Sequence, residues 1–156
     1  MTKAFEEFLA KKAKAKVRKE KRAARARELW TKPTGSLIEL KKKIVHQLGL
    51  RDKRLNGDSC RIHRKKCSGP YCGYHLVPQA RGGMARLDPR GVVYACTAAN
   101  RGEQMNRSLY REKHVEIFGE ALILELEALT KIEDTRARPE LEEMLARLVE
   151  ENKSLT

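Results

Sequence analysis

All four cysteines of the chain and two of its four histidines lie between positions 60 and 96, and both residue types bind transition metals. Cys60 and His63 are separated by two residues, and Cys67, Cys72 and Cys96 follow at wider intervals. In structural sites Zn²⁺ takes four sulfur or nitrogen ligands in a tetrahedron, commonly from two short pairs of residues. The residue types and their spacing therefore make all five residues candidate zinc ligands.

The second short pair is incomplete, because Ala99 stands three residues after Cys96. A tetrahedron therefore needs either Cys67 or Cys72 as its fourth ligand. In a cytosolic protein, clustered cysteines indicate a metal site before they indicate disulfide bonds. The sequence predicts a structural zinc site, and it leaves open a set of reduced, partly buried thiols without a metal.

Charge points to a polyanionic partner. The 156 residues suit one ordinary domain and carry 34 Lys and Arg against 21 Asp and Glu, a net charge of +13. Residues 1–32 hold 12 basic and 4 acidic side chains, residues 33–111 hold 16 and 5, and residues 112–156 hold 6 and 12. This distribution predicts nucleic-acid binding by the first two segments and leaves the acidic end for solvent or a protein partner.

Neither a membrane partner nor secretion is expected from the sequence. No run approaches the roughly 18 apolar residues of a membrane span, and the basic N-terminal stretch lacks the apolar core of a secretory signal. These features predict a cytoplasmic protein.

Helical patterns flank the cysteine-containing segment on both sides. Residues 3–30 lack Pro and Gly and are rich in Ala, Lys, Arg and Glu, which predicts a solvated basic helix, with a flexible solubilising tail as the alternative. Ser36 and Glu39 match a capping box, and the apolar residues that follow predict a helix that ends at Gly49 and has Lys41–Lys43 on its outer face.

The segment between these helical patterns is rich in glycine and short of regular structure. Val92–Ala95 reads as one strand and Tyr74–Val77 as a second. After Asn106 the helical spacing of apolar residues returns, with a break expected at Gly119, and Pro139 opens a last amphipathic helix whose other face is rich in Glu. A segment so rich in loops needs a cross-link to fold, and a bound metal is the obvious one.

The segment Tyr74–Gly83 resembles the first strand of HNH nucleases, where a histidine precedes an apolar pair, a proline and a basic glycine turn. A longer block resembles the NinG (Rap) family of lambdoid phage recombination proteins, over about residues 44–129. The positions that carry this second resemblance are Leu50–Lys53, Ala85–Pro89, Val92–Cys96, Asn100, Arg101, Asn106, Tyr110, Arg111 and Val115–Gly119.

The resemblance implies an α+β fold that is mostly helical, with a small zinc-stapled ββα-metal core flanked by helices. It implies that His75 is the general base on water and that Asn100 is a ligand of a catalytic Mg²⁺ or Mn²⁺. It also makes Cys60, His63 and Cys96 zinc ligands, with His63 where the family has Cys. The sequence departs from the family pattern at Tyr74, Gly91, Val93, Ala99 and Leu109.

The departures bear on the catalytic metal and on the orientation of the base. In the family an Asn at the position of Gly91 would orient the histidine. Asn100 alone is a poor anchor for Mg²⁺ or Mn²⁺, which prefer hard oxygen or imidazole ligands. Asp88 or Glu103 would add a carboxylate if the fold brings either one close.

These observations predict a metal-dependent DNA endonuclease of the HNH type that acts in phage DNA recombination or processing, in the host cytoplasm if the chain is phage-encoded. The alternative is a catalytically degenerate HNH fold that binds DNA without sequence preference or regulates a partner. The expected organisation is a basic helical N-terminal extension (residues 1–32), an HNH/NinG-like domain (residues 36–130) and an acidic C-terminal helix that could dock a protein partner (residues 131–156). The residues expected to bind nucleic acid are Lys41, Lys42, Lys43, Arg64, Lys65, Lys66, Arg81 and Arg101.

Overall fold

The structure is a computed structural model that describes residues 3–78 and 83–155. Its contacts divide the chain into two compact units, residues 1–32 and residues 33–156. The first unit is helix α1 (Lys3–Thr31), which confirms the predicted basic helix. Every side chain from Lys11 to Arg25 is exposed, so this part of α1 buries no apolar face.

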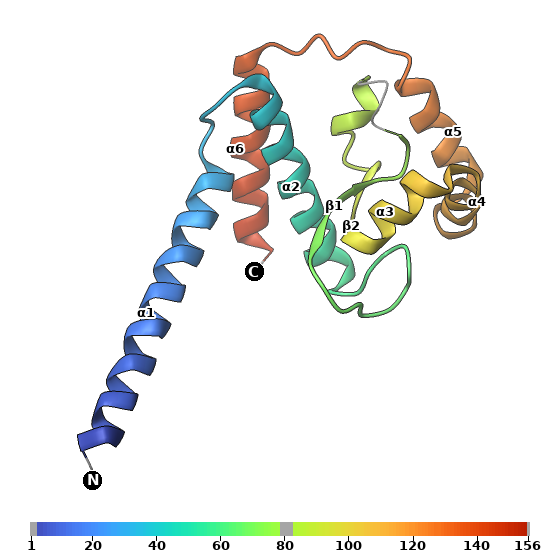
Figure 1. Ribbon diagram of the computed structural model, residues 1–156. Coiled ribbons are helices and arrows are strands. Elements are labelled where there is room, and N and C mark those ends of the chain that lie inside the picture. The colour runs from blue at the N-terminus through green and yellow to red at the C-terminus, as the bar shows by residue number, and fades with distance from the viewer. Residues whose placement is uncertain (1–2, 79–82, 156) are drawn as a thin grey trace. The chain divides into compact units, whose positions relative to one another are not determined.

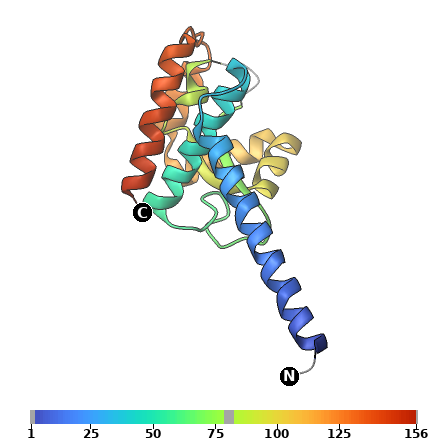
Figure 2. The ribbon, with the colours of Figure 1, turned by 90° about the vertical axis from the view of Figure 1, so that its left-hand side faces the viewer.

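The second unit is mostly helical and contains a two-stranded antiparallel sheet, which confirms an α+β class. The sheet lies between α2 and α3, and α2 and α6 run side by side (Figures 1 and 2). Its elements are α2 (Leu37–Asn56), β1 (Tyr71–His75), the 3₁₀ helix η2 (Met84–Leu87), β2 (Val92–Cys96), α3 (Thr97–Met105), α4 (Arg107–Phe118), α5 (Glu120–Leu129) and α6 (Arg138–Ser154).

Helix α2 begins as predicted and ends later than predicted. The amide of Ser36 donates to Oε2 of Glu39 at 2.7 Å, and the amide of Glu39 donates to Oγ of Ser36 at 3.3 Å, so the capping box is present. Gly49 does not end the helix, which continues to Asn56. A Cβ atom at Gly49 would lie 2.7 Å from Cα of Gly73. This glycine therefore serves a close approach of helix and strand rather than a helix end.

The sheet joins two strands of five residues with Tyr71 opposite Cys96 and His75 opposite Val92. The predicted strand at Val92–Ala95 is confirmed and extends by one residue. The predicted strand at Tyr74–Val77 is misplaced, because pairing with β2 starts at Tyr71 and ends at His75. β1 therefore runs along the whole hairpin, with Tyr71 at the Cys96 end and His75 at the Val92 end.

Each face of the hairpin contributes to a separate apolar core. Neighbouring residues of a strand point to opposite faces, and Val92 packs with α2 and α6 while Val93 packs with residues of α3 and α5. Leu141, Leu145 and Leu148 bring α6 into the first of these cores. Residues 131–156 therefore complete the fold of the second unit.

The three consecutive lysines of α2 differ in environment, so the predicted outer face of Lys41–Lys43 is wrong at Lys43. Lys43 is 6% exposed, and its ammonium donates to the carbonyl and the hydroxyl of Thr34 at 2.7 and 3.1 Å. The physical reason is helical spacing, which places Lys43 three residues after the buried Leu40. Lys41 is half-buried, and only Lys42 of the three is exposed.

A buried ion pair ties α2 to the segment before α6. The carboxylate of Asp134, whose side chain is 2% exposed, lies 2.8 Å from Nζ of Lys41 and 2.7 Å from Nε of Arg136. Burial raises the pKa of Asp134, but the hydrogen bonds from Arg136 and Lys41 outweigh it and hold the pKa below its ordinary value. The charged carboxylate is therefore stabilised in the folded chain.

We expect Asp134→Asn to lower the free energy of unfolding by about 1–3 kcal/mol at neutral pH. Because the pKa of Asp134 is lower in the folded chain, its contribution is complete above the unfolded value near pH 4 and is lost as the pH falls through the folded pKa. Denaturant titrations at neutral and acidic pH measure the difference in free energy of unfolding between the wild type and Asp134→Asn, with the exposed neighbour Glu133→Gln as control. A difference that does not become smaller in acid, or an equal loss of stability in the control, would contradict a stabilising role for the charged Asp134.

Candidate metal centre and adjoining pocket

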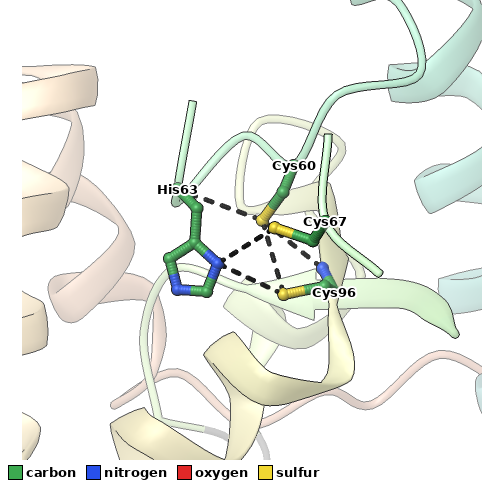
Figure 3. Close-up of side chains that lie close together, drawn as sticks. All are labelled: Cys60, His63, Cys67 and Cys96. Atoms are coloured by element: carbon green, nitrogen blue, oxygen red, sulfur yellow. Dashed lines mark hydrogen bonds between the residues drawn. The ribbon is translucent and has the colours of Figure 1, made fainter. Parts of the chain in front are cut away.

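Cys60, His63, Cys67 and Cys96 direct one ligand atom each toward the same point, and these atoms all lie within 4.8 Å of one another (Figure 3). Nδ1 of His63 is 3.3 Å from Sγ of Cys67 and 3.3 Å from Sγ of Cys96. The Sγ atoms of Cys60 and Cys96 are 3.8 Å apart. A metal ion could be held by this Cys/His cluster.

The distances and the donor atoms both fit zinc. Zn–S bonds of about 2.3 Å and Zn–N bonds of about 2.0 Å at tetrahedral angles separate two sulfurs by about 3.8 Å, and a sulfur and a nitrogen by about 3.5 Å. Thiolate and imidazole are ligands that zinc prefers, whereas Mg²⁺ and Ca²⁺ prefer oxygen. Four protein ligands close the tetrahedron, as in structural rather than catalytic zinc sites.

A tight turn places the first two ligands. The amide of Cys60 donates to the carbonyl of Lys65 at 3.0 Å, and the amide of Arg64 donates back to the carbonyl of Cys60 at 2.7 Å. Arg64 takes a positive φ of 53° to close the turn. The chain thereby folds back so that the side chains of Cys60 and His63 point the same way.

Backbone amides favour the thiolate form of Cys60. Burial raises the pKa of this thiol, but the amides of Cys96 and His63, at 3.4 and 3.5 Å from its Sγ, help to bring the pKa below its ordinary value. Cys96 ends β2 and is the N-cap of α3. The turn and the helix start thus place the Cys60 and Cys96 thiols side by side.

Cys67 is the fourth member of the cluster, and β1 holds it in place. The hydroxyl of Tyr71 accepts from the amide of Cys67 at 2.6 Å and donates to the carbonyl of Cys67 at 3.1 Å. The ring of Tyr71 stacks on that of Tyr94, with centroids 4.6 Å apart. Of the two cysteines left open by the sequence, the structure selects Cys67, and Cys72 lies outside the cluster on β1.

This selection predicts different outcomes for two serine variants. We expect Cys67→Ser to weaken Zn²⁺ binding by at least about 10-fold, since a hydroxyl is a poor zinc ligand. Cys72→Ser removes a thiol from the neighbouring strand, and it should leave the zinc content and affinity unchanged. Competition with a chromogenic zinc chelator measures both affinities. Equal losses in the two variants would contradict the choice of Cys67.

His75 lies at the opposite end of β1 and is 5% exposed. Its Nε2 lies 2.9 Å from the carbonyl oxygen of Arg86 in η2, and because a carbonyl only accepts, Nε2 carries the proton. Burial lowers the pKa of His75 to about 4, so the ring is neutral near pH 7 and Nδ1 is its basic nitrogen. Gly91 has no side chain that could orient the ring, and the Arg86 carbonyl orients it instead.

His75 and Asn100, the two residues expected to be catalytic, line one pocket of about 340 Å³. Glu103 lines it as well, whereas Asp88 is held by Arg90 with Nη2 and Oδ2 3.0 Å apart. The sequence analysis did not include two further residues of the wall, Gln104 and Arg107. Helical spacing from Asn100 could have suggested Gln104, but Arg107 begins the next helix. The remaining lining residues are Val77 and Pro78.

Glu103 is hydrogen-bonded to Tyr74, which forms a buried polar network with His114. The hydroxyl of Tyr74 is 2.9 Å from Nε2 of His114, and both residues are almost fully buried. Burial raises the pKa of Glu103, although a hydrogen bond from Tyr74 and the charge of Arg107 oppose the rise. Burial also raises the pKa of Tyr74 and lowers that of His114.

The remaining candidate nucleic-acid contacts are distributed over the surface of the second unit. Arg64, Lys65 and Lys66 are exposed on the turn beside the Cys/His cluster, and Arg101 is exposed on α3. Lys66 also pairs with Asp58, 2.9 Å from its Oδ2. Arg81 lies outside the described residues. Across residues 3–78 and 83–155, no helix has both the length and the hydrophobicity needed to cross a bilayer.

The hairpin carries one candidate site at each of its ends. The Cys/His cluster lies at one end of the hairpin and the His75 pocket at the other. Helix α3 contributes to both sites. Its N-cap, Cys96, belongs to the cluster, and residues of its first two turns line the pocket. Comparisons with family models, with curated proteins and with solved structures gave no significant match to this chain.

Proposed function

We propose that this protein is a metal-dependent DNA endonuclease of the HNH type, with His75 as the general base. One observation carries the proposal: a buried, neutral histidine at the end of β1 and Asn100 on α3 line the same pocket. An antiparallel hairpin followed directly by a helix positions both residues. This is the order of elements that the HNH resemblance implied.

The chemistry assigned to the chain is the activation of water. Nδ1 of His75 takes a proton from a water molecule, which attacks the phosphorus of a phosphodiester, and the bond to the leaving sugar oxygen breaks. The leaving oxygen takes a proton from solvent. A bound Mg²⁺ or Mn²⁺ would stabilise the charge that develops on the phosphate oxygens and the leaving oxygen. The Arg86 carbonyl accepts a hydrogen bond from Nε2–H of His75, so Nδ1 is the nitrogen that can take the proton.

The Cys/His cluster has a structural part in this proposal, with Zn²⁺ as its metal. Cys67 supplies the ligand that Ala99 cannot, and Ala99 is instead fully buried in the apolar core. The zinc ion would join the turn after α2 to the start of α3. It would thereby fix the helix that presents Asn100 to the pocket.

The positive charge of the chain supports DNA as the substrate, and it predicts binding that depends steeply on salt. Contacts to about four phosphates would weaken binding about 100-fold between 50 and 200 mM salt. Deleting residues 1–32 should reduce that slope and leave the melting temperature unchanged, because the described side chains of α1 are exposed over Lys11–Arg25. Fluorescence anisotropy with labelled DNA at several salt concentrations measures the slope. A flat salt response would contradict phosphate contacts as the source of affinity.

A DNA-binding protein without catalysis is the second candidate, and Val93 favours it. Val93 is buried in the core at a position where the resemblance has a histidine, so this position supplies no imidazole. The two candidates differ in a nicking assay on supercoiled plasmid and on branched DNA with Mg²⁺ or Mn²⁺. Cleavage that EDTA abolishes supports the nuclease, and binding without cleavage supports the second candidate.

A further inference from the structure

The pocket beside His75 has one source of negative charge among the residues that the structure describes. Asn100 and Gln104 offer neutral amide oxygens, and Glu103 is the one carboxylate in the pocket wall. Mg²⁺ and Mn²⁺ bind through hard oxygen ligands, usually with one or two carboxylates. Arg107 adds a positive charge to the same wall, so a divalent ion in this pocket would depend on Glu103 for all of the compensating negative charge.

The positions of these residues on α3 suit a shared ligand set. Asn100 and Glu103 are three residues apart, and residues at this spacing lie next to each other on one helix face. Both line the pocket that His75 closes from the strand side. An amide oxygen and a carboxylate can thus reach one ion while Nδ1 of His75 remains the base.

The buried network holds the carboxylate of Glu103. Tyr74 hydrogen-bonds Glu103, and the phenol has a single proton, so it donates to the carboxylate. The phenol oxygen also lies 2.9 Å from Nε2 of His114, a residue that is 1% exposed. Tyr74 thus holds the Glu103 carboxylate, and Glu103 lines the pocket.

We propose that Glu103 is the carboxylate ligand of the divalent ion, and that Tyr74 and His114 are positioning residues that orient it. The proposal rests on the proposed nuclease function and names a residue outside the expected catalytic pair. Tyr74 directly precedes His75 on β1, and its phenol supports a carboxylate that comes from α3.

The test is a titration of the full-length, zinc-loaded chain with Mn²⁺, in which electron paramagnetic resonance measures the bound ion. Zinc loading keeps Mn²⁺ away from the Cys/His cluster. We expect one Mn²⁺ site that Glu103→Gln weakens about 100-fold or more, because the substitution removes a direct ligand, and that Tyr74→Phe weakens about 10-fold, because it removes a hydrogen bond to a ligand. Glu103→Asp should restore part of the affinity. The matched control is Glu112→Gln, an exposed glutamate of α4.

Outcomes for this site and for the nuclease are separable. Mn²⁺ binding that depends on Glu103 in a chain that does not cut DNA would support the site and overturn the nuclease. Equal Mn²⁺ affinity in the wild type and in Glu103→Gln would overturn the site, even if both proteins cut DNA. Absence of Mn²⁺ binding to the wild-type chain would overturn it as well. The melting temperature and zinc content of each variant show that the fold is retained.

Discussion

Loss of metal from the Cys/His cluster is expected to destabilise the second unit strongly. We expect the purified chain to contain one zinc ion and Cys96→Ser to lose it, with a fall of more than about 4 kcal/mol in the free energy of unfolding. The reason is that Cys96 is buried at the junction of β2 and α3, and the long turn between α2 and β1 is joined to it through the cluster. A strong zinc chelator should have the same effect on the wild type.

Metal analysis and denaturant titration measure these two effects. Cys72→Ser is the matched control, because it removes a half-buried thiol of β1 that does not belong to the cluster. A wild-type chain that holds no metal and does not gain stability when zinc is added would contradict the prediction. It would favour the alternative of reduced, partly buried thiols.

Substitution of His75 is expected to abolish cleavage while DNA binding is retained. Removal of a general base typically costs about 10²- to 10⁴-fold in rate, and that is the role we propose for His75 from its position in the pocket. His75→Ala leaves a cavity in a buried site, so His75→Asn is the second variant, since its amide can still donate a hydrogen bond. Both should bind DNA as the wild type does, because a buried neutral ring contributes no phosphate contact.

Single-turnover cleavage rates and DNA affinities measure these expectations together. His46→Asn is the control, since His46 lies on α2 and lines neither site. Equal cleavage rates in His75→Asn and the wild type would exclude His75 as the base. A parallel loss of DNA affinity would mean that the residue supports the fold of the binding surface instead.

Local signals in the sequence predicted local structure well. These signals are the Ser36–Glu39 capping box, the strand at Val92, the break at Gly119 and the helix start at Pro139. Each depends on neighbours within a few residues, and each is present in the structure. Three cluster ligands could be predicted for the same reason. Cys60 and His63 share one turn, and Cys96 precedes a helix.

Features set by distant contacts could not be read from the sequence. Gly49 looks like a helix end, but its role is to let α2 approach Gly73 of β1. The choice of Cys67 over Cys72 depends on the turn before β1, where Tyr71 holds Cys67. Sequence reasoning named Glu103 only as one of two options, because its nearness to His75 results from the packing of α3 on the hairpin.

The most direct test of the central proposal is cleavage of supercoiled and branched DNA by the zinc-loaded chain, with Mg²⁺ or Mn²⁺, beside His75→Asn. We predict cleavage by the wild type that stops in EDTA and is lost in the variant, with equal DNA affinity in the two proteins. No cleavage by wild-type protein that contains zinc and binds DNA would contradict the nuclease.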